Sequence, residues 1–370
     1  MRGTIPLILS LSALLAACGG GAAPAASSAP VSQAAAVSPA ASKPAASSSA
    51  ASTSAKPAAS TSNGGAKEKL SMAYTAPTLA QLPPMVAKEE GYFDQNGIDA
   101  DVTLIGAGSQ PQAALLGNQI QMYEGGPDVI SASIAGADLE FFGAAETAFL
   151  FDLYGAPNVK TAADLKGGKV AVTSLTSSTY TAARLAVKQL GLDPDKDVTY
   201  IAVNNPPAIL SAMETGAVQA GTVGPTNISQ VQASGKFNLL ADISKLNQPY
   251  PAGWWAVSKK WADGHDATMQ HMTKALVQAV AYMIQQPDGT KQVLAKYSKN
   301  NDPVFLNGNY QVESPHLQKV PYADVKGVEL VLQELSATIP AAKTADANKY
   351  VDNHWVKALD DSGFINSLYK

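Results

Sequence analysis

Cysteine and arginine are the two residue types that this 370-residue chain nearly lacks. Its one cysteine is Cys18, which excludes an internal disulfide framework and any metal site built from several cysteines. Its two arginines are Arg2 and Arg184. The formal net charge of −4 is small and negative, so the chain has neither the charge of a nucleic-acid-binding surface nor that of a basic membrane-binding face.

Patterns typical of enzymes are also missing. The four histidines are scattered, and the two closest, His265 and His271, are six residues apart. That spacing does not place them on a common helix face, as a metal site on a helix requires. No nucleophile-elbow, Ser-x-x-Lys or P-loop pattern occurs at a predicted strand–helix junction. We therefore expect a protein that binds and does not catalyse, with no metal and no cofactor.

Residues 1–17 have the features of a secretory signal peptide. Arg2 precedes the apolar stretch Ile5–Ala17, which is too short to span a bilayer as a mature helix. The two alanines directly before Cys18 resemble a bacterial lipobox, in which the signal is cut before the cysteine and the cysteine carries lipid. We predict that Cys18 is lipidated. The alternative is an ordinary secretory signal followed by a chance cysteine.

Residues 18–66 contain almost nothing that could form a core. The segment is nearly all Ala, Ser, Pro, Gly and Thr, and it has no aromatic residue. Such a composition cannot bury enough apolar surface to offset chain entropy, so it predicts a disordered tether. The remaining part, residues 67–370, is large for one core and fits two lobes. It has no apolar run long enough to span a membrane.

Strand, loop and helix alternate along this globular part, which predicts α/β sheets with parallel neighbours. The predicted strands are 70–74, 98–105, 120–123, 169–173, 198–203, 220–223 and 239–243. The predicted helices between them are 82–90, 106–116, 127–135, 180–190, 207–215 and 224–235. Helical patterns dominate the C-terminal part, at 267–286, 291–298, 322–335 and 354–359. This order leaves two organisations open: two independent domains, or two lobes with the C-terminal third returning to the first.

Several segments resemble the solute receptors of ABC importers for sulfonates, taurine, nitrate and thiamine-precursor pyrimidines. The segments, in the order found in that family, are AKEEGYF at 87–93, NGIDADV at 96–102, GAGS at 106–109, ADLKG at 163–167 and SGFI at 362–365. The resemblance implies a type II periplasmic-binding-protein fold, with two α/β lobes, a two-strand hinge and a helical C-terminal third. By this resemblance lobe 1 comprises residues 67–153 and 245–370, and lobe 2 comprises residues 154–244.

The same resemblance implies a function. The chain would be an extracytoplasmic receptor that binds a small organic solute in the cleft between its lobes and delivers it to an ABC permease. We expect a monomer in the cell envelope, facing the periplasm or the cell surface, that meets the membrane only through its lipid anchor. Two alternatives stay open. One is an enzyme on the same fold that acts on a small heterocycle or acid, and the other is a surface protein that senses a ligand.

Polar loops that follow the predicted strands supply the candidate ligand-binding groups, because strand carboxyl ends and helix N-termini face the cleft in such sheets. The candidates on lobe 1 are Thr75, Ala76, Pro77, Thr78, Gly108, Ser109 and Gln110. The candidates on lobe 2 are Thr176, Ser177, Ser178, Thr179, Asn204, Asn205, Thr226 and Asn227. Taken singly, each is more often a helix cap than a ligand contact.

Glu124, followed by Gly125 directly after a predicted strand, gives a sharper indication. A carboxylate in the cleft favours a ligand with an amine, amidine or ring N–H and repels sulfonate or nitrate. The alternative is a solvated charge in a loop. Either tryptophan of the pair Trp254–Trp255 could stack on a planar ligand while the other packs in the core, and Trp254 is included among the candidates. Arg184 lies inside a predicted helix, and we assign it to a surface or interlobe ion pair.

Overall fold

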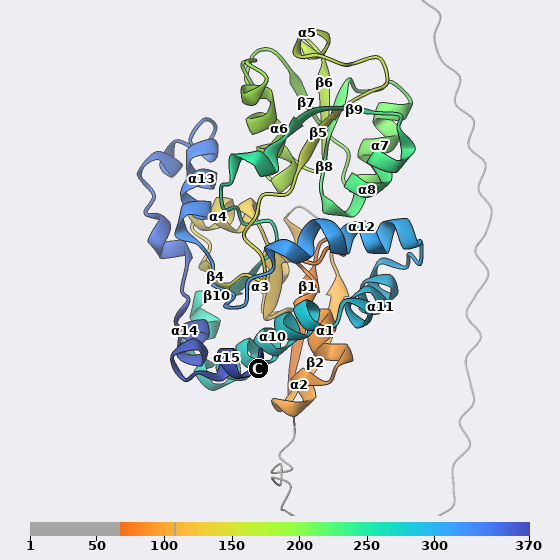
Figure 1. Ribbon diagram of the computed structural model, residues 1–370. Coiled ribbons are helices and arrows are strands. Elements are labelled where there is room, and N and C mark those ends of the chain that lie inside the picture. Colours follow the sequence, from red (N-terminus) through yellow and green to blue (C-terminus); the bar gives the residue numbers. More distant parts are fainter. Residues whose placement is uncertain (1–66, 107–108) are drawn as a thin grey trace, which may run out of the picture. The chain divides into compact units, whose positions relative to one another are not determined.

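The computed structural model describes residues 67–106 and 109–370, whose helices and strands are shown in Figure 1. The predicted signal peptide, Cys18 and tether lie outside the described residues, as does the candidate Gly108. Two five-stranded mixed sheets form the centres of two lobes, which confirms the predicted α/β class. No helix in the two described ranges is long and apolar enough to cross a membrane.

The first sheet has the strand order β2-β1-β3-β10-β4. Its first three strands run parallel to one another, and β10 is antiparallel to both of its neighbours. The strands are β1 (Glu68–Tyr74), β2 (Ile98–Leu104), β3 (Met122–Gly125), β4 (Leu139–Gly143) and β10 (Trp254–Ser258). The helices between them are α1 (Pro83–Glu89), α2 (Tyr92–Gln95), α3 (Gln110–Leu116) and α4 (Pro127–Ile134).

The second sheet repeats this arrangement with the order β7-β6-β8-β5-β9. Here β5 is the strand that runs antiparallel to its neighbours. The strands are β5 (Asp152–Gly155), β6 (Lys169–Val172), β7 (Thr199–Ala202), β8 (Ala220–Val223) and β9 (Asn238–Asp242). The helices are α5 (Ala162–Leu165), α6 (Ser178–Gln189), α7 (Pro206–Glu214) and α8 (Pro225–Ser234).

The chain therefore crosses between the sheets twice, after β4 and again before β10. We call residues 144–151 and 243–253 the crossing segments. They pair with each other: the N–H of Tyr250 donates to the carbonyl of Thr147 at 2.8 Å, and the rings of Phe149 and Tyr250 stack with centroids 3.7 Å apart. This is the predicted two-strand hinge.

The C-terminal third is helical, as predicted, and its elements pack mainly on the first lobe. They are α9 (Lys259–Asp263), α10 (Asp266–Gln285), α11 (Pro287–Ser298), α12 (Pro303–Glu313), α13 (Val325–Leu335), α14 (His354–Asp361) and α15 (Phe364–Ser367), with short 3-10 turns between some of them. Helix α12 also packs on α8 of the second lobe (Figure 1). At Gly308 of α12 a Cβ would lie 2.0 Å from the hydroxyl of Ser229, so this approach requires glycine.

Three of the differences from the sequence-based expectations concern the elements around the cavity. The third strand was predicted at 120–123, but β3 continues through Gly125 because Glu124 and Gly125 are in register with Trp255 and Trp254 of β10. Strands β4, β5 and β10 were not predicted, since each is buried on both faces and shows no alternation of polar and apolar residues. Helix α12 was also missed, although Asp302 caps its first turn by accepting from the N–H of Val304 at 2.9 Å.

Arg184 forms an interlobe ion pair, one of the two alternatives left open by the sequence, and it also pairs with Asp195 of its own lobe. Its Nε donates to Glu334 of α13 at 3.3 Å, and both side chains are 4% exposed. Lys188, one turn further along α6, reaches the other oxygen of Glu334 at 2.6 Å and is 44% exposed. Glu334 therefore ties α6 of the second lobe to α13 through one buried and one half-exposed cation.

We expect Arg184→Met to lower the free energy of unfolding by about 3 kcal/mol, because it leaves the buried carboxylate of Glu334 with one partner only. The value lies at the low end of the range for such changes, since Lys188 still pairs with Glu334. Urea unfolding followed by circular dichroism measures it. The matched control Lys188→Met removes the half-exposed partner and should cost less than about 1 kcal/mol. Equal losses in the two variants would show that the buried pair has no special role.

Candidate functional site

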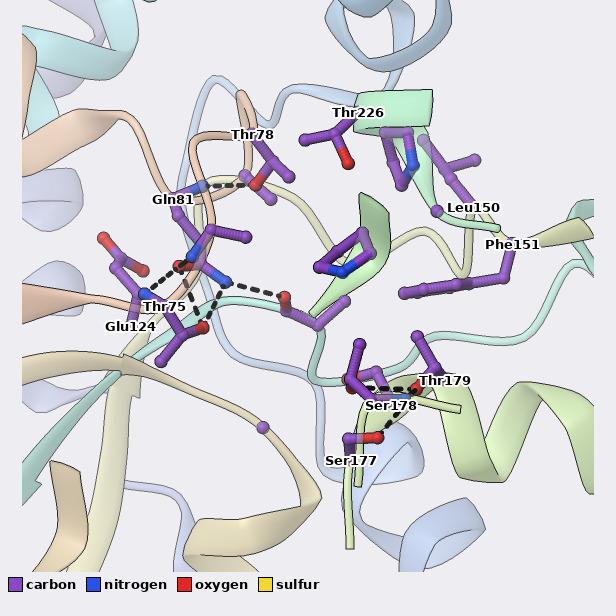
Figure 2. A pocket seen from close by; sticks show the side chains of 18 of the residues that line it. Thr75, Thr78, Gln81, Glu124, Leu150, Phe151, Ser177, Ser178, Thr179 and Thr226 are labelled. Carbon is purple, nitrogen blue, oxygen red and sulfur yellow. Dashed lines mark hydrogen bonds between the residues drawn. The ribbon is translucent and has the colours of Figure 1, made fainter. Parts of the chain in front are cut away.

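A cavity of about 380 Å³ lies between the two lobes and is lined by both of them. Figure 2 shows Thr75, Gln81 and Glu124 of the first lobe on one side and Ser177, Ser178 and Thr179 of the second lobe on another. The lining residues follow the carboxyl ends of β1, β3, β6, β7 and β8, and others belong to the first crossing segment. A volume of this size fits a small organic molecule.

The wall on the second lobe is built from hydroxyl groups that are bonded to one another. The hydroxyl of Thr179 accepts from the backbone N–H of Thr173 at 2.8 Å and lies 2.8 Å from that of Ser177. The Ser177 hydroxyl donates to the carbonyl of Ser174 at 2.7 Å. Thr222 at the end of β8 lines the cavity with a buried hydroxyl that has no partner. These bonds hold the loop before α6 in one conformation.

On the first lobe, Gln81 organises the loop that follows β1. Its side-chain oxygen accepts from the backbone N–H groups of Thr75 at 2.8 Å and Ala76 at 3.0 Å. Its amide nitrogen donates to the hydroxyl of Thr75 at 3.1 Å and to the carbonyl of Ala252 in the second crossing segment at 3.5 Å. The side chain is 5% exposed. Gln81 therefore fixes the Thr75 loop against the hinge.

Glu124 is buried and has no partner. Its side chain is 1% exposed, and neither carboxyl oxygen makes a hydrogen bond within the described structure. Burial raises the pKa of the Glu124 carboxyl well above its ordinary value. A polar group in this condition costs free energy until a donor reaches it. The structure thus excludes the solvated-loop alternative for this residue.

Two more buried glutamates line the cavity. Glu146 lies in the first crossing segment and Glu313 is the last residue of α12. Burial raises the pKa of Glu313 to about 7, and burial together with the charge of Glu313 raises the pKa of Glu146 well above its usual range. The fourth acid, Asp128, accepts from the hydroxyl of Tyr123 and the N–H of Gly126, both at 2.9 Å, and from Gln112.

No lysine, arginine or histidine belongs to the cavity lining among the residues that the structure describes. The same residues contain no cluster of three or more acidic, histidine or cysteine side chains that could hold a metal ion. Leu150 and Phe151 add an apolar wall (Figure 2). The cavity can therefore offer hydrogen-bond acceptors, hydroxyl groups and an apolar surface, and its only ionisable groups are acids.

Most of the residues predicted from the sequence come together here. The cavity is lined by Thr75, Ala76, Thr78, Glu124, Gly125, Thr176, Ser177, Ser178, Thr179, Asn204, Asn205 and Thr226. It is not lined by Pro77, Ser109, Gln110, Asn227 or Trp254. Trp254 is fully buried, packs edge-on against Phe141 and donates its ring N–H to the carbonyl of Glu146 at 3.0 Å. It is a core residue that supports the crossing segment.

Sequence reasoning missed Gln81, Glu146, Glu313, Leu150 and Phe151. Gln81 stands three residues after Thr78, the last candidate in the loop after β1, but nothing in the sequence shows that its amide would fold back on that loop. The other four lie in the first crossing segment or at the end of α12, neither of which was predicted as an element. Their place in the cavity depends on contacts between segments far apart in the chain.

We expect Gln81→Leu to destabilise the protein by about 1 kcal/mol, because it leaves two half-buried N–H groups of the Thr75 loop without an acceptor. Denaturant unfolding measures this loss. The control Thr75→Val removes only a hydroxyl from the same loop and should cost less. If the two substitutions have the same effect, the acceptor role of Gln81 is contradicted.

Comparisons with solved structures show where this fold occurs. The alkanesulfonate-binding protein SsuA from Xanthomonas axonopodis pv. citri, solved bound to MOPS, is 20% identical, with 78% of this chain and 99% of that chain covered and a TM-score of 0.64. The periplasmic nitrate-binding protein NrtA from Synechocystis PCC 6803 is 13% identical, with 80% and 89% covered and a TM-score of 0.61. At these identities the two binding proteins show the fold of this chain.

The fold is shared with a protein of another kind. DSZB in complex with biphenyl-2-sulfinic acid is 15% identical, with 80% of this chain and 99% of that chain covered and a TM-score of 0.57. No curated protein matches the chain in sequence. The family described as NMT1/THI5 like matches residues 80–290, which is more than half of the 370 residues. The chain therefore belongs to the NMT1/THI5-like family.

Proposed function

We propose that this chain is a lipid-anchored, extracytoplasmic receptor that binds a small organic solute between its lobes and delivers it to an ABC importer. The observation that supports this most directly is the cavity, because both lobes line it and a paired hinge joins them. A solute that contacts both lobes stabilises their closed arrangement over an open one. In this proposal Thr75 and Thr78 contact the solute from the first lobe, and Ser178 and Thr226 contact it from the second.

The charge of the lining specifies the kind of solute. Every ionisable group in the described lining is an acid, so a sulfonate or nitrate ion would find no cation to pair with and would be repelled by any of these acids that ionises. A solute with N–H donors or a positive charge would instead give Glu124 the partner that it lacks. We infer that the solute is an amine, an amidine or an N–H-bearing heterocycle. In this respect the chain differs from a receptor for an inorganic anion.

An enzyme on the same fold is a second candidate, and one observation favours it. The pKa of Glu313, raised to about 7 by burial, is the value expected of a general acid or base at neutral pH. The fold of DSZB is also similar. Incubating the protein with its solute and recovering the solute unchanged excludes this candidate, whereas steady conversion in the presence of the protein would support it.

Mass spectrometry of the small molecules released from freshly purified, denatured protein tests the proposed function most directly. We expect a nitrogen-bearing solute at close to one molecule per chain. Recovery of a sulfonate or another strong anion instead would contradict the inferred charge of the solute, although not the receptor role.

We expect Glu124→Gln to weaken the binding of an amine-bearing solute by roughly 1.5–3 kcal/mol, the range for a hydrogen bond to a charged group. Isothermal titration calorimetry with the recovered solute measures the change. Glu140→Gln is the matched control, because Glu140 is a buried glutamate outside the cavity. Equal affinities of wild type and the Glu124 variant would show that the solute does not reach this residue.

The same Glu124 substitution should stabilise the empty protein at neutral pH. Burial raises the pKa of Glu124 above its ordinary value of 4.5, so the folded state holds a proton that the unfolded state releases. The free energy of unfolding therefore falls as the pH rises above the unfolded pKa, and Gln removes that decrease. Unfolding curves measured at pH 5 and at pH 8, at the same ionic strength, test this prediction. A variant that is less stable than wild type at pH 8 would contradict this.

The anchor is tested separately. We expect Cys18→Ser to give a folded protein that no longer partitions with membranes, because the thiol that would carry lipid is gone. Fractionation of cells that express wild type and variant, followed by salt washing and immunoblotting, measures the distribution. If the variant stays with the membranes after the salt wash, the anchor lies elsewhere.

A further inference from the structure

We propose that Glu146 and Glu313 form a second cation-binding subsite in the cavity, so that the solute carries two separate N–H-bearing cationic centres, one for Glu124 and one for this pair. This inference rests on the proposed receptor function and specifies the chemical class of its solute. A linear diamine and a compound with an amine and an amidine at its two ends both belong to that class.

Both members of the pair are held firmly in place. Glu146 is 4% exposed, its carbonyl accepts the ring N–H of Trp254 at 3.0 Å, and its backbone forms an antiparallel bridge to Leu317. Glu313 is fully buried, and its Oε2 accepts from the backbone N–H of Ala80 at 3.1 Å. These contacts fix the backbone of Glu146 and one carboxyl oxygen of Glu313 in the cavity wall, so both residues are positioned before any solute arrives.

Each member also has an oxygen with nothing to bind. Oε2 of Glu146 and Oε1 of Glu313 are buried and make no hydrogen bond among the described residues. Glu313 lies at the C-terminal end of α12, where the helix dipole adds to the cost of a negative charge. The two carboxyls also repel each other, since the charge of Glu313 raises the pKa of Glu146. An ammonium or amidinium group between them would supply donors for both oxygens and offset the repulsion.

The other two buried glutamates each have a cation nearby, whereas buried Asp152, also outside the cavity lining, forms no ion pair among the described residues. Glu140 lies 3.8 Å from the ammonium of Lys259, and Glu334 is paired with Arg184 and Lys188. Both of these glutamates lie outside the cavity lining. The three that line it, Glu124, Glu146 and Glu313, form no ion pair within the described part of the chain. Where a solute can enter, the protein leaves its buried acids without a cation.

The two acidic positions are separate. Glu146 and Glu313 influence each other's ionisation, whereas the pKa of Glu124 is raised by burial alone. Glu124 is in register with Trp255 in the middle of the first sheet, while Glu146 belongs to the crossing segment and Glu313 to α12. Because Glu124 belongs to a different element from the pair, we assign one cationic centre of the solute to each position.

Titration calorimetry with three probe series tests the inference: α,ω-diaminoalkanes, primary monoamines and α,ω-diols of matching chain length. We expect the wild-type protein to bind the best diamine at least about tenfold more tightly than the monoamine of the same length, which is about 1.4 kcal/mol, and to bind the diols least. Glu313→Gln and Glu146→Gln should each abolish the preference for the diamine. Gln at position 313 can still accept from Ala80, so the fold should be retained, and thermal unfolding checks this.

Glu140→Gln is the matched control and should keep the preference, because it neutralises a buried glutamate outside the cavity. The inference is overturned if wild type binds monoamines and diamines equally, if neither Glu146→Gln nor Glu313→Gln alters the preference, or if no diamine binds. The receptor function is judged by a different result, the solute released from the purified protein. A retained solute with a single N–H-bearing centre would overturn the second subsite and leave that function standing.

Discussion

The pairing of the two crossing segments is the constraint on which the site depends. Because the chain passes between the sheets twice, the segments must lie side by side, and they are joined by the hydrogen bond from Tyr250 to Thr147 and by the stacked rings of Phe149 and Tyr250. Alternate residues of the first segment then face the cavity, among them Glu146, Ala148 and Leu150. The same residues that link the lobes thus form part of the wall between them, so a solute that contacts this wall also contacts the hinge.

The buried glutamates outside the cavity have cationic partners, and those that line it have none among the described residues. Arg184 is used between α6 and α13, where it neutralises the buried Glu334, and the described cavity lining has no basic side chain. An empty cavity with unpartnered carboxyl oxygens is a cost to the folded state, because each buried acid must keep a proton or go without a partner. The binding of a cationic solute would remove that cost. The unfavourable burial and the proposed affinity therefore have the same physical origin.

The sequence was most informative where local chemistry decides the structure. Gly, Pro and hydroxyl residues at strand ends predicted the loops after β1, β6 and β7, and most of the candidates in those loops line the cavity. It was least informative for segments that tertiary contacts define. Strands β4, β5 and β10 are buried on both faces and have no alternating pattern, and β3 extends to Gly125 only because β10 pairs with it. Glu313 is held at the cavity by a hydrogen bond from Ala80, which lies 233 residues away in the sequence. No local sequence pattern could reveal such a contact.

The polar residues of the two walls differ in what they leave available. In the second lobe, Ser177 and Thr179 use their hydroxyls on each other and on the backbone of their own loop, so this wall is organised without a solute. In the first lobe, Gln81 does the same for the Thr75 loop, but Glu124 has both oxygens unused. A wall whose hydrogen bonds are already satisfied determines the shape of the cavity. An unsatisfied buried acceptor favours solutes that carry a hydrogen-bond donor at that point. Selectivity in this cavity should therefore reside in its buried glutamates, and its hydroxyl loops should set the size of the solute that fits between them.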